Sequence, residues 1–419
     1  MIASLSRFVA FLWRLTNGRI GIALALNVLA SFTEGVSLFL LIPLIATIDA
    51  GRSGPAIDIP IIGDLVQRFQ PSLGLLLIGF VVLIVIQGAL VRSKTLYLTA
   101  VMHRAIDRLR QAFFVNAGNA QWEVLQQSRV SDLNNILTVE TSRIQIAASN
   151  LTSLFQALIL LLTYLAMALL VSWQMALFAG CIGLVMFAVL YPIRRQATRF
   201  GQDVGQMFRE QNHILLEFLN GIRVAKSFLI EDAYAKRFWQ RLSLIRQSTL
   251  RYARISTLGT YSFQVMSAIA AAAFIWVAVE VAQLDFGRLV VLLLIFLRLA
   301  PRFGAMQESM QNLLSNLPAF DSFREQSTVF AQAAEPKGEM SEAAPRFTDE
   351  IRLEGLSLSY PGAAKPALED VNLSIKFGRI TALIGPSGSG KSTIADLVMG
   401  LLRPTDRPPP SGPRGLLVH

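Results

Sequence analysis

Residues 385–392 read Gly-Pro-Ser-Gly-Ser-Gly-Lys-Ser, which are the residue types and spacing of a phosphate-binding loop (P-loop), G-x-x-x-x-G-K-[ST]. Glycines let the backbone curl so that successive amide N–H groups point at one anion, and the positive end of a following helix adds to this attraction. Lys391 is expected to contact the β- and γ-phosphates of ATP, and the Ser392 hydroxyl to bind Mg²⁺. The candidate binding residues in the loop are Gly385, Pro386, Ser387, Gly388, Ser389, Gly390, Lys391, Ser392 and Thr393.

The residues on either side of the loop predict the elements that must position it. The apolar run Thr381–Ile384 is expected to be a short buried strand that enters the loop. Ile394, Leu397 and Val398 recur at helical spacing and predict a helix that leaves it. A glycine-rich turn without a ligand is the alternative, and this strand–loop–helix order argues against it.

The composition indicates an integral membrane protein. Hydrophobic residues make up 53% of the 419 residues and charged residues 16%, against roughly 25% in an ordinary soluble domain. The mean hydropathy is +0.49. The net charge of +10 is spread between long apolar stretches instead of forming one patch. That distribution is typical of cytoplasmic loops beside anionic lipid, and it argues against a nucleic-acid partner.

A span needs roughly 20 apolar residues to cross about 30 Å of hydrocarbon, and the sequence predicts six spans. The uncharged stretch from Ile144 to Ile193 is long enough for two, with a turn near Ser172 and Trp173. The sixth span, after Asp285 and Arg288, is interrupted by arginines. It is included because an even number of spans is needed to place both ends of the chain on the same side of the membrane. The other three predicted spans lie in Ile20–Ile48, Phe69–Val91 and Ile255–Val279.

Basic residues are dense in two long loops, 92–143 and 194–254, and sparse in the loops on the opposite side, such as 49–71. The positive-inside rule therefore places both long loops and both termini in the cytoplasm, for a multi-pass protein of the plasma (inner) membrane. The helical periodicity of the two long loops suggests that the membrane helices continue well into the cytosol. Residues 1–19 have an amphipathic pattern typical of a short helix in the membrane interface.

With six spans before such a P-loop, the chain resembles ABC transporters of the exporter type. Residues 217–238 look like the family segment around the second coupling helix, and residues 128–144 are similar to the segment that follows the first. The sequence LSLSYPG places Tyr360 where the family stacks an aromatic ring on adenine, although a strand-core role for Tyr360 is an open alternative.

The resemblance implies a mainly α, polytopic membrane protein: a six-helix, type-1 ABC exporter domain followed by an incomplete α/β P-loop domain. The expected parts are an interfacial helix (1–19), the transmembrane domain (20–323), a linker (324–346), a nucleotide-binding fragment (347–404) and a disordered Pro-rich tail (405–419). The resemblance also implies a homodimer, or a heterodimer with another half-transporter, that couples ATP to transport of a lipid, peptide or drug-like molecule.

The pattern of the family stops after residue 406, where the chain reads RPPPSGPRGLLVH. The sequence contains no Q-loop, LSGGQ-type signature loop, acidic Walker B strand or switch histidine, so ATPase activity from this chain alone is not expected. The alternative function is therefore a truncated, non-catalytic membrane protein, for example one produced by a frameshift. Such a protein would be inactive or would depend on a complete partner subunit.

Several isolated residues carry open alternatives. Glu34 and Arg298 are charged residues at the expected depth of the membrane. Three roles are open for them: lining a cargo cavity, forming an inter-helix pair, or extending the charged group to the membrane interface. The sequence favours the structural alternatives. His103 and His213 are expected to be ordinary surface residues, and Cys181 a small buried apolar residue.

Overall fold

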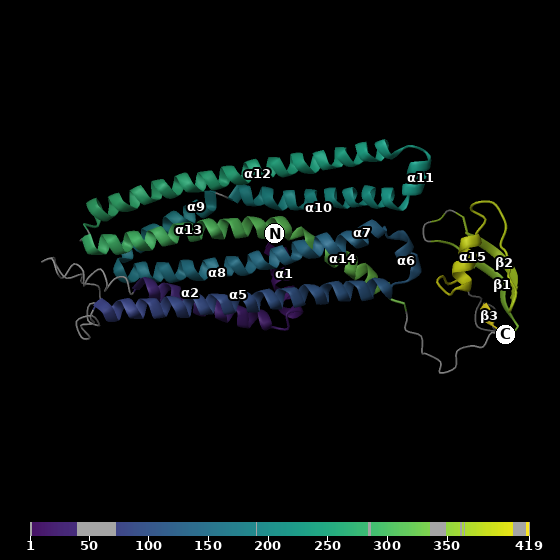
Figure 1. The fold of residues 1–419 in the computed structure, drawn as a ribbon, viewed down its shortest axis with the longest axis horizontal. Helices are drawn as coiled ribbons and strands as arrows, with labels where there is room; N and C mark the ends of the chain where they lie inside the picture. The colour runs from purple at the N-terminus through teal and green to yellow at the C-terminus, as the bar shows by residue number, and fades with distance from the viewer. Residues whose placement is uncertain are drawn as a thin grey trace. The chain divides into compact units, whose positions relative to one another are not determined.

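The computed structural model describes residues 2–39, 73–189, 191–283, 286–335, 349–360, 363, 365–404 and 416–418. The chain divides into two compact units (Figure 1). The helical unit contains residues 1–114 and 130–326, and the C-terminal unit contains residues 115–129 and 327–419. The predicted outer loop 49–71 lies outside the described residues.

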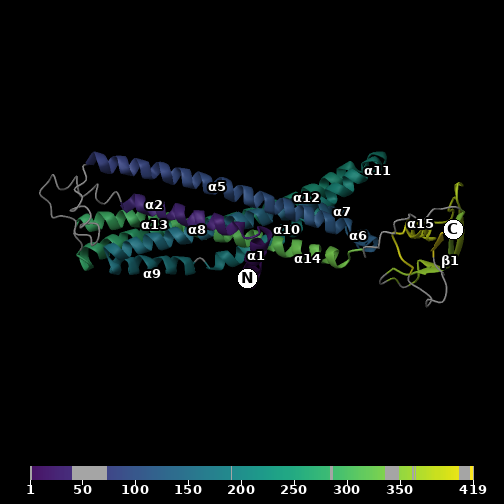
Figure 2. The same cartoon turned by 90° about the horizontal axis from the view of Figure 1, so that it is seen from below.

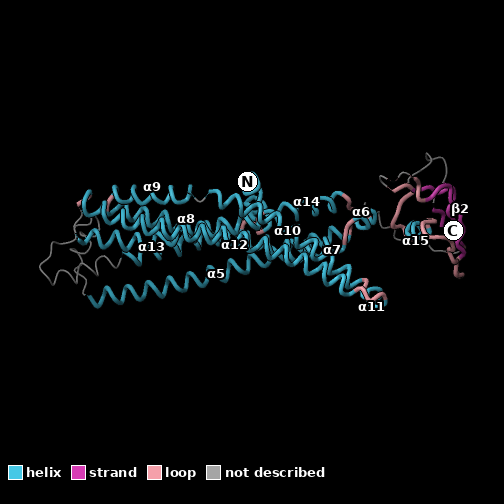
Figure 3. Tube along the Cα trace, turned by 90° about the horizontal axis from the view of Figure 1, so that it is seen from above, coloured by secondary structure: helices cyan, strands magenta, loops and turns pink. Residues whose placement is uncertain are grey.

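The helical unit consists of long helices that lie alongside one another, and the strands are confined to the C-terminal unit (Figure 3). Turns of π-helix, Ile136–Glu140 and Val277–Val281, precede α8 and follow α12. The helices are α1 (Ile2–Leu15), α2 (Arg19–Phe39), α5 (Leu73–Gly118), α7 (Val130–Asn135), α8 (Thr141–Val171), α9 (Trp173–Val189), α10 (Tyr191–Asn220), α11 (Ile222–Ser227), α12 (Glu231–Trp276), α13 (Phe286–Asn316) and α14 (Pro318–Gln332).

Four described helical segments are long and apolar enough to cross a membrane, and a fifth is added if the bent pair of α1 and α2 counts as one span. The predicted turn at Ser172 is confirmed, because α8 ends just before this residue and α9 begins just after it. Among the described residues α13 is not one of these segments. The sixth span therefore stays a prediction. The four segments are Leu77–Gly118, Val130–Val171, Trp173–Asn220 and Glu231–Val281.

The helices α5 and α12 each contain 46 residues. At about 1.5 Å per residue each is roughly 70 Å long, more than twice the thickness of the hydrocarbon layer. This length confirms the prediction that the spanning helices continue far beyond the apolar stretch. The short helices α6 (Trp122–Gln127) and α11 lie where the long helices reverse, as the resemblance to coupling segments implies.

The apolar core of the helical unit lies where α8, α9, α12 and α13 meet. Tyr164, Met175 and Leu292 are each at most 1% exposed there, and the rings of Phe274 and Phe296 stack at 4.9 Å between centroids. The expectation for Cys181 was wrong: it is exposed on α9, on the outside of a helix apolar all round. The buried members of this core are Leu160, Tyr164, Met167, Ala168, Met175, Ala176, Ala179, Ala270, Phe274, Ala278, Leu292, Ile295, Phe296 and Leu299.

A buried ionic network, called the Glu140 cluster below, joins α8, α10 and α13. The Glu140 carboxylate is 1% exposed and accepts from Arg143 Nη1 at 3.2 Å and from Arg209 Nη1 at 3.4 Å. Arg143 Nη2 also donates to the carbonyl oxygens of Gly201 (2.7 Å) and Ser315 (2.9 Å). The guanidinium of Arg143, at the start of α8, therefore binds the Glu140 carboxylate and main-chain oxygens of both α10 and α13.

The first two helices meet at a sharp elbow of 105°. Asn17 and Gly18 adopt positive φ angles of 50° and 72°, a region open to glycine and tolerated by asparagine. The Trp13 ring packs over the elbow, where a Cβ on Gly21 would lie 3.2 Å from its Cη2 atom. Residues 2–15 thus form the predicted N-terminal helix, directed away from the line of α2.

In the C-terminal unit, three antiparallel strands form a sheet in the order β2-β1-β3. The strands are β1 (Glu350–Leu358), β2 (Leu368–Lys376) and β3 (Leu416–Val418). β3 departs from the expectation of a disordered tail, because Ile351 of β1 pairs with Val418 on one side and with Ile375 on the other. The sheet and the helix α15 (Lys391–Val398) enclose Leu353, Leu356, Leu358, Leu368, Leu397 and Leu402.

Two segments that are distant in the chain pair next to α6. Ala120 and Ala334 form an isolated antiparallel bridge, in which Gln121 N donates to Ala333 O and Glu335 N to Asn119 O, both at 2.8 Å. The side chain of Trp122, on α6, packs against the apolar core of the C-terminal unit.

The linker expected over 324–346 differs from the structure in its first part. Residues 324–332 continue α14, because this helix buries an apolar face that includes Phe323 and Phe330. Residues 336–348 lie outside the part of the chain that is described.

Candidate functional site

The P-loop connects β2 to α15, and α15 begins at Lys391. Gly388 and Gly390 have φ angles of 83° and 81°, and Gly390 is the N-cap of the helix. A Cβ on Gly390 would lie 2.4 Å from Leu368 Cδ2 and 3.1 Å from Ala367 O. Gly390 is therefore required both for its backbone angles and for its close approach to β2.

The ammonium group of Lys391 folds back onto the loop. Its Nζ donates to the carbonyl oxygens of Gly385 at 2.9 Å and Pro386 at 2.7 Å, and lies 3.3 Å from Ser389 Oγ. These acceptors are neutral, so the positive charge is held at the loop without a carboxylate among the contacts of its Nζ. A phosphate oxygen can replace them in a stronger, charge-assisted hydrogen bond.

The structure brings Tyr360 to the same place as the loop residues. The Tyr360 hydroxyl lies 3.3 Å from Thr393 Oγ1, and Thr393, the third residue of α15, is 8% exposed. The Tyr360 ring also packs against the leucine core of the C-terminal unit. This contact agrees with the alternative role in the strand core, and stacking on adenine stays a prediction. Ser392 is exposed, so its hydroxyl is accessible to a metal ion.

The strand predicted over Thr381–Ile384 is not formed, which corrects the sequence expectation. Ile380 and Ile384 are 101% and 94% exposed, and the segment pairs with none of the described strands. A strand of this kind normally lies inside a sheet covered on both faces. Within the described residues no neighbouring strand or helix covers it, so the apolar run is exposed and forms no strand.

The two charges predicted at membrane depth, Glu34 and Arg298, have different surroundings in the structure. Glu34 of α2 forms an ion pair with Arg302 of α13, and the Tyr164 hydroxyl donates to Glu34 Oε1 at 3.0 Å. Arg298, one turn before Arg302, is exposed. Glu34 is thus part of an inter-helix pair, one of the structural alternatives that the sequence favoured.

Lys94 is a buried cation that the sequence placed among the basic residues of the first cytoplasmic loop. It is 5% exposed, and its Nζ donates to Asn27 Oδ1 at 3.0 Å and to Gln156 Oε1 at 2.9 Å. The charge pattern contains no signal that separates Lys94 from the exposed arginines around it, because its partners come from two other helices.

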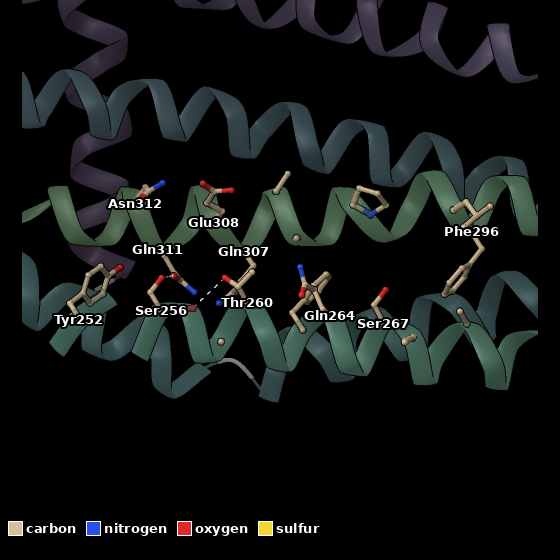
Figure 4. Close-up of a pocket in the computed structure, with 18 residues that line it drawn as sticks. Tyr252, Ser256, Thr260, Gln264, Ser267, Phe296, Gln307, Glu308, Gln311 and Asn312 are labelled. Carbon is tan, nitrogen blue, oxygen red and sulfur yellow. Dashed lines mark hydrogen bonds between the residues drawn. The ribbon is translucent and has the colours of Figure 1, made fainter. Parts of the chain in front are cut away.

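A cavity of about 790 Å³ lies between α12 and α13 (Figure 4). Polar side chains from both helices face one another across it, and Ser256 Oγ donates to Gln311 Oε1 at 3.0 Å. Apolar groups, including Phe263 and Phe296, line other parts of the wall. The polar lining residues are Tyr252, Ser256, Thr260, Gln264, Ser267, Gln307, Glu308, Gln311 and Asn312.

Sequence reasoning missed this cavity, although a signal exists in α12. Ser256, Thr260, Gln264 and Ser267 recur every three or four residues, so they share one face of α12. A polar stripe on an apolar spanning helix indicates a surface that faces something other than lipid.

Comparison with known proteins gives two family matches. Residues 20–300 match the ABC transporter transmembrane region, and residues 368–407 match the family described as ABC transporter. The second match includes the P-loop.

Similar proteins include two bacterial ATP-dependent lipid A-core flippases and a plant protein. The flippase of Chromobacterium violaceum is 28% identical over 313 residues, which are 72% of this chain and 51% of the flippase. That of Methylobacillus flagellatus is 24% identical over 309 residues, 71% of this chain and 50% of the flippase. ABC transporter B family member 14 of Arabidopsis thaliana is 25% identical over 342 residues, 78% of this chain and 27% of the plant protein.

The chain thus spans about half the length of the flippases that it matches. Its match to the transmembrane region alone covers more than half of the chain. The chain therefore belongs to the ABC transporters, with a membrane region of the exporter type followed by part of a nucleotide-binding domain.

Proposed function

We propose that this chain is a subunit of an ABC exporter that moves a lipid-like, amphipathic molecule across the inner membrane, with both termini in the cytoplasm. The observation that carries this proposal is the cavity between α12 and α13. Its volume is within the range of about 300–1,000 Å³ found for small-molecule sites, and its walls combine polar and aromatic groups. The two flippases whose names specify lipid A core favour a lipid among the lipid, peptide and drug-like cargoes.

The P-loop residues fit ATP with Mg²⁺. The space beside Gly388 is open to an anion, the N-terminus of α15 and Lys391 supply positive charge, and the exposed Ser392 supplies a hydroxyl ligand for the metal. The bound nucleotide supplies the free energy for transport. The chain's own residues hold its phosphates and its metal ion at the start of α15.

Hydrolysis requires more than the P-loop, because a carboxylate has to orient the attacking water. None of the side chains that contact Lys391 Nζ is a carboxylate. We propose, from the membership of the ABC transporters, that the functional form is a dimer with a second copy or with another half-transporter, of which only a complete half-transporter would add the carboxylate. The open segment at Ile380–Ile384 favours the second candidate function, a subunit without ATPase activity of its own that depends on a complete partner.

The nucleotide proposal is tested by replacing Lys391 with alanine. Loss of a charge-assisted hydrogen bond costs about 1.5–3 kcal/mol, so binding of a fluorescent ATP analogue to the purified chain is expected to weaken roughly 10- to 150-fold. Lys365→Ala, at an exposed lysine of the same unit, is the matched control and should bind as the wild type does. Equal binding by Lys391→Ala and wild type would contradict the site.

The cargo proposal is tested by filling the cavity. Thr260→Trp places an indole in the space between α12 and α13, so the affinity of the chain in nanodiscs for a fluorescent lipid analogue should fall at least about tenfold, or roughly 1.4 kcal/mol. Leu258→Trp is the control, because Leu258 is 62% exposed on α12 and does not line the cavity. Unchanged affinity in Thr260→Trp, or the same loss in both variants, would exclude the cavity as the cargo site.

A further inference from the structure

The N-terminal helix α1 has two faces with different surroundings. On one face Phe8 and Leu12 are 0% and 2% exposed. On the other, Val9 and Trp13 are 45% and 53% exposed. A helix of 14 residues that buries only one face has a second surface available for another partner.

The inner face of α1 holds the first turn of α14 (Figure 2). Phe320 is 2% exposed and lies between two rings of α1, with centroid distances of 5.3 Å to Phe8 and 4.9 Å to Phe11. The adjacent carboxylate of Asp321 accepts from Ser4 Oγ at 2.8 Å and pairs with Arg7 at 3.8 Å. Aromatic and polar contacts therefore join the two helices at neighbouring residues.

Helix α14 follows α13 and leads along the chain to the bridge at Ala334 and then to β1. Its Phe323 ring also packs on Phe113 of α5, at 5.4 Å between centroids. The start of α14 is thus held from two directions, by α1 and by the end of α5. Helix α1 therefore contacts the first turn of the helix that precedes, along the chain, the segment leading to the P-loop.

The outer face of α1 carries Arg14 beside Trp13, and Arg19 lies just beyond the elbow at the start of α2, whereas Arg7 pairs with Asp321 on the inner face. Residues 1–19 contain Arg7, Arg14 and Arg19 and no acidic residue. Arg14 and Arg19 are exposed and have no ion pair within the part of the chain that is described. The 105° elbow means that, if α2 crosses the bilayer, α1 lies close to the plane of its surface. Arginine and tryptophan are the side chains that anionic headgroups and the interfacial layer attract.

We propose that α1 is a lipid-dependent brace: its outer face binds the anionic surface of the membrane, and this binding keeps its inner face on α14. Bound lipid keeps α1 in the position in which Phe8 and Phe11 contact Phe320. The contact between α1 and α14 is therefore populated more of the time when the membrane surface is anionic. Each basic residue near such a surface contributes about 1 kcal/mol, or roughly a fivefold shift in the equilibrium. The proposal uses the membrane position of α1 but not the identity of the cargo or the nucleotide.

The experiment compares the full chain in nanodiscs of phosphatidylcholine and in nanodiscs of phosphatidylcholine mixed with phosphatidylglycerol. Hydrogen–deuterium exchange is followed in peptides that cover α1 and the first turns of α14. Exchange in both helices is expected to be at least about fivefold slower in the anionic nanodiscs. Equal exchange in the two lipids, or faster exchange in the anionic one, would overturn the proposal.

Two variants separate the lipid surface from the helix contact. Arg14→Gln removes an outer charge that does not touch α14, and it should reduce the lipid response of α14 roughly fivefold while leaving exchange in phosphatidylcholine unchanged. Phe320→Ala should release both helices in either lipid. A lipid response of α14 that is the same in Arg14→Gln as in the wild type counts against the brace. Binding of the fluorescent ATP analogue by the same preparations tests the P-loop site independently of the brace.

Discussion

Replacing Gly201 with alanine is expected to lower the free energy of unfolding of the helical unit by about 3 kcal/mol. A Cβ at this position would lie 1.9 Å from Ser315 O and 2.7 Å from Ser315 C, so α10 and α13 have to separate. Overpacking of this kind costs about 1–3 kcal/mol. The separation also weakens the two hydrogen bonds from Arg143 to Gly201 O and Ser315 O, which involve a charged donor.

The measurement is a denaturant titration of the purified chain in mixed micelles, followed by circular dichroism. Gly180→Ala is the matched control, because its new Cβ would find only Leu165 Cδ1, at an ordinary 3.7 Å. Alanine favours a helix by about 1 kcal/mol over glycine, so the control should be as stable as the wild type or slightly more stable. A Gly201→Ala protein as stable as the control would show that α10 and α13 are not in contact at this point.

Replacing Glu140 with alanine is expected to cost about 3–5 kcal/mol, because it leaves the guanidinium groups of Arg143 and Arg209 without their shared carboxylate. The expected loss of stability is large because the ion pair is buried. The Glu140 side chain is 1% exposed and that of Arg143 10%, so water cannot replace the lost partner of Arg143, whereas Arg209 is 36% exposed and can be hydrated.

A surface pair of the same residue types provides the comparison. Glu210 Oε2 lies 2.6 Å from Arg241 Nη1, and the two side chains are 38% and 45% exposed. Such exposed pairs contribute about 0–1 kcal/mol to the free energy of unfolding. In the same titration Glu210→Ala should therefore be nearly neutral. If the two variants are destabilised equally, the Glu140 cluster is not a buried network in the protein. Glu140→Gln, which keeps the shape but loses the charge, should fall between them.

The long helices and the P-loop helix could be predicted from the sequence because local patterns determine them. An uncharged run with a break at Ser172 is enough to separate α8 from α9, and the glycines before Lys391 are enough to place the start of α15. The continuation of α5 into residues 92–118, the first part of the loop predicted to be cytoplasmic, also follows from the pattern within one segment.

Features that depend on distant partners could not be predicted in this way. Lys94 has the same local surroundings as the exposed arginines, and only Asn27 and Gln156 make it a buried donor. The partner of Glu34 is Arg302, one helical turn beyond the arginine that the sequence singled out, since the facing side of α13 is decided by packing.

The prediction of a strand at Thr381–Ile384 is wrong for a related reason. Its composition is that of a buried strand, but a strand is formed by hydrogen bonds to neighbours, and the described sheet offers none at this segment. Local preference alone does not make a strand.

The pairing of Ala120 with Ala334 bears on the order in which the chain acquires its structure. These residues lie on either side of most of the helical unit, so the ribosome completes α7 to α14 before the second partner exists. Closing so long a loop in an unfolded chain is entropically unfavourable, whereas folded membrane helices bring its ends together at little further cost. The leucine core that contacts Trp122 is therefore expected to assemble last, after the bundle is in place.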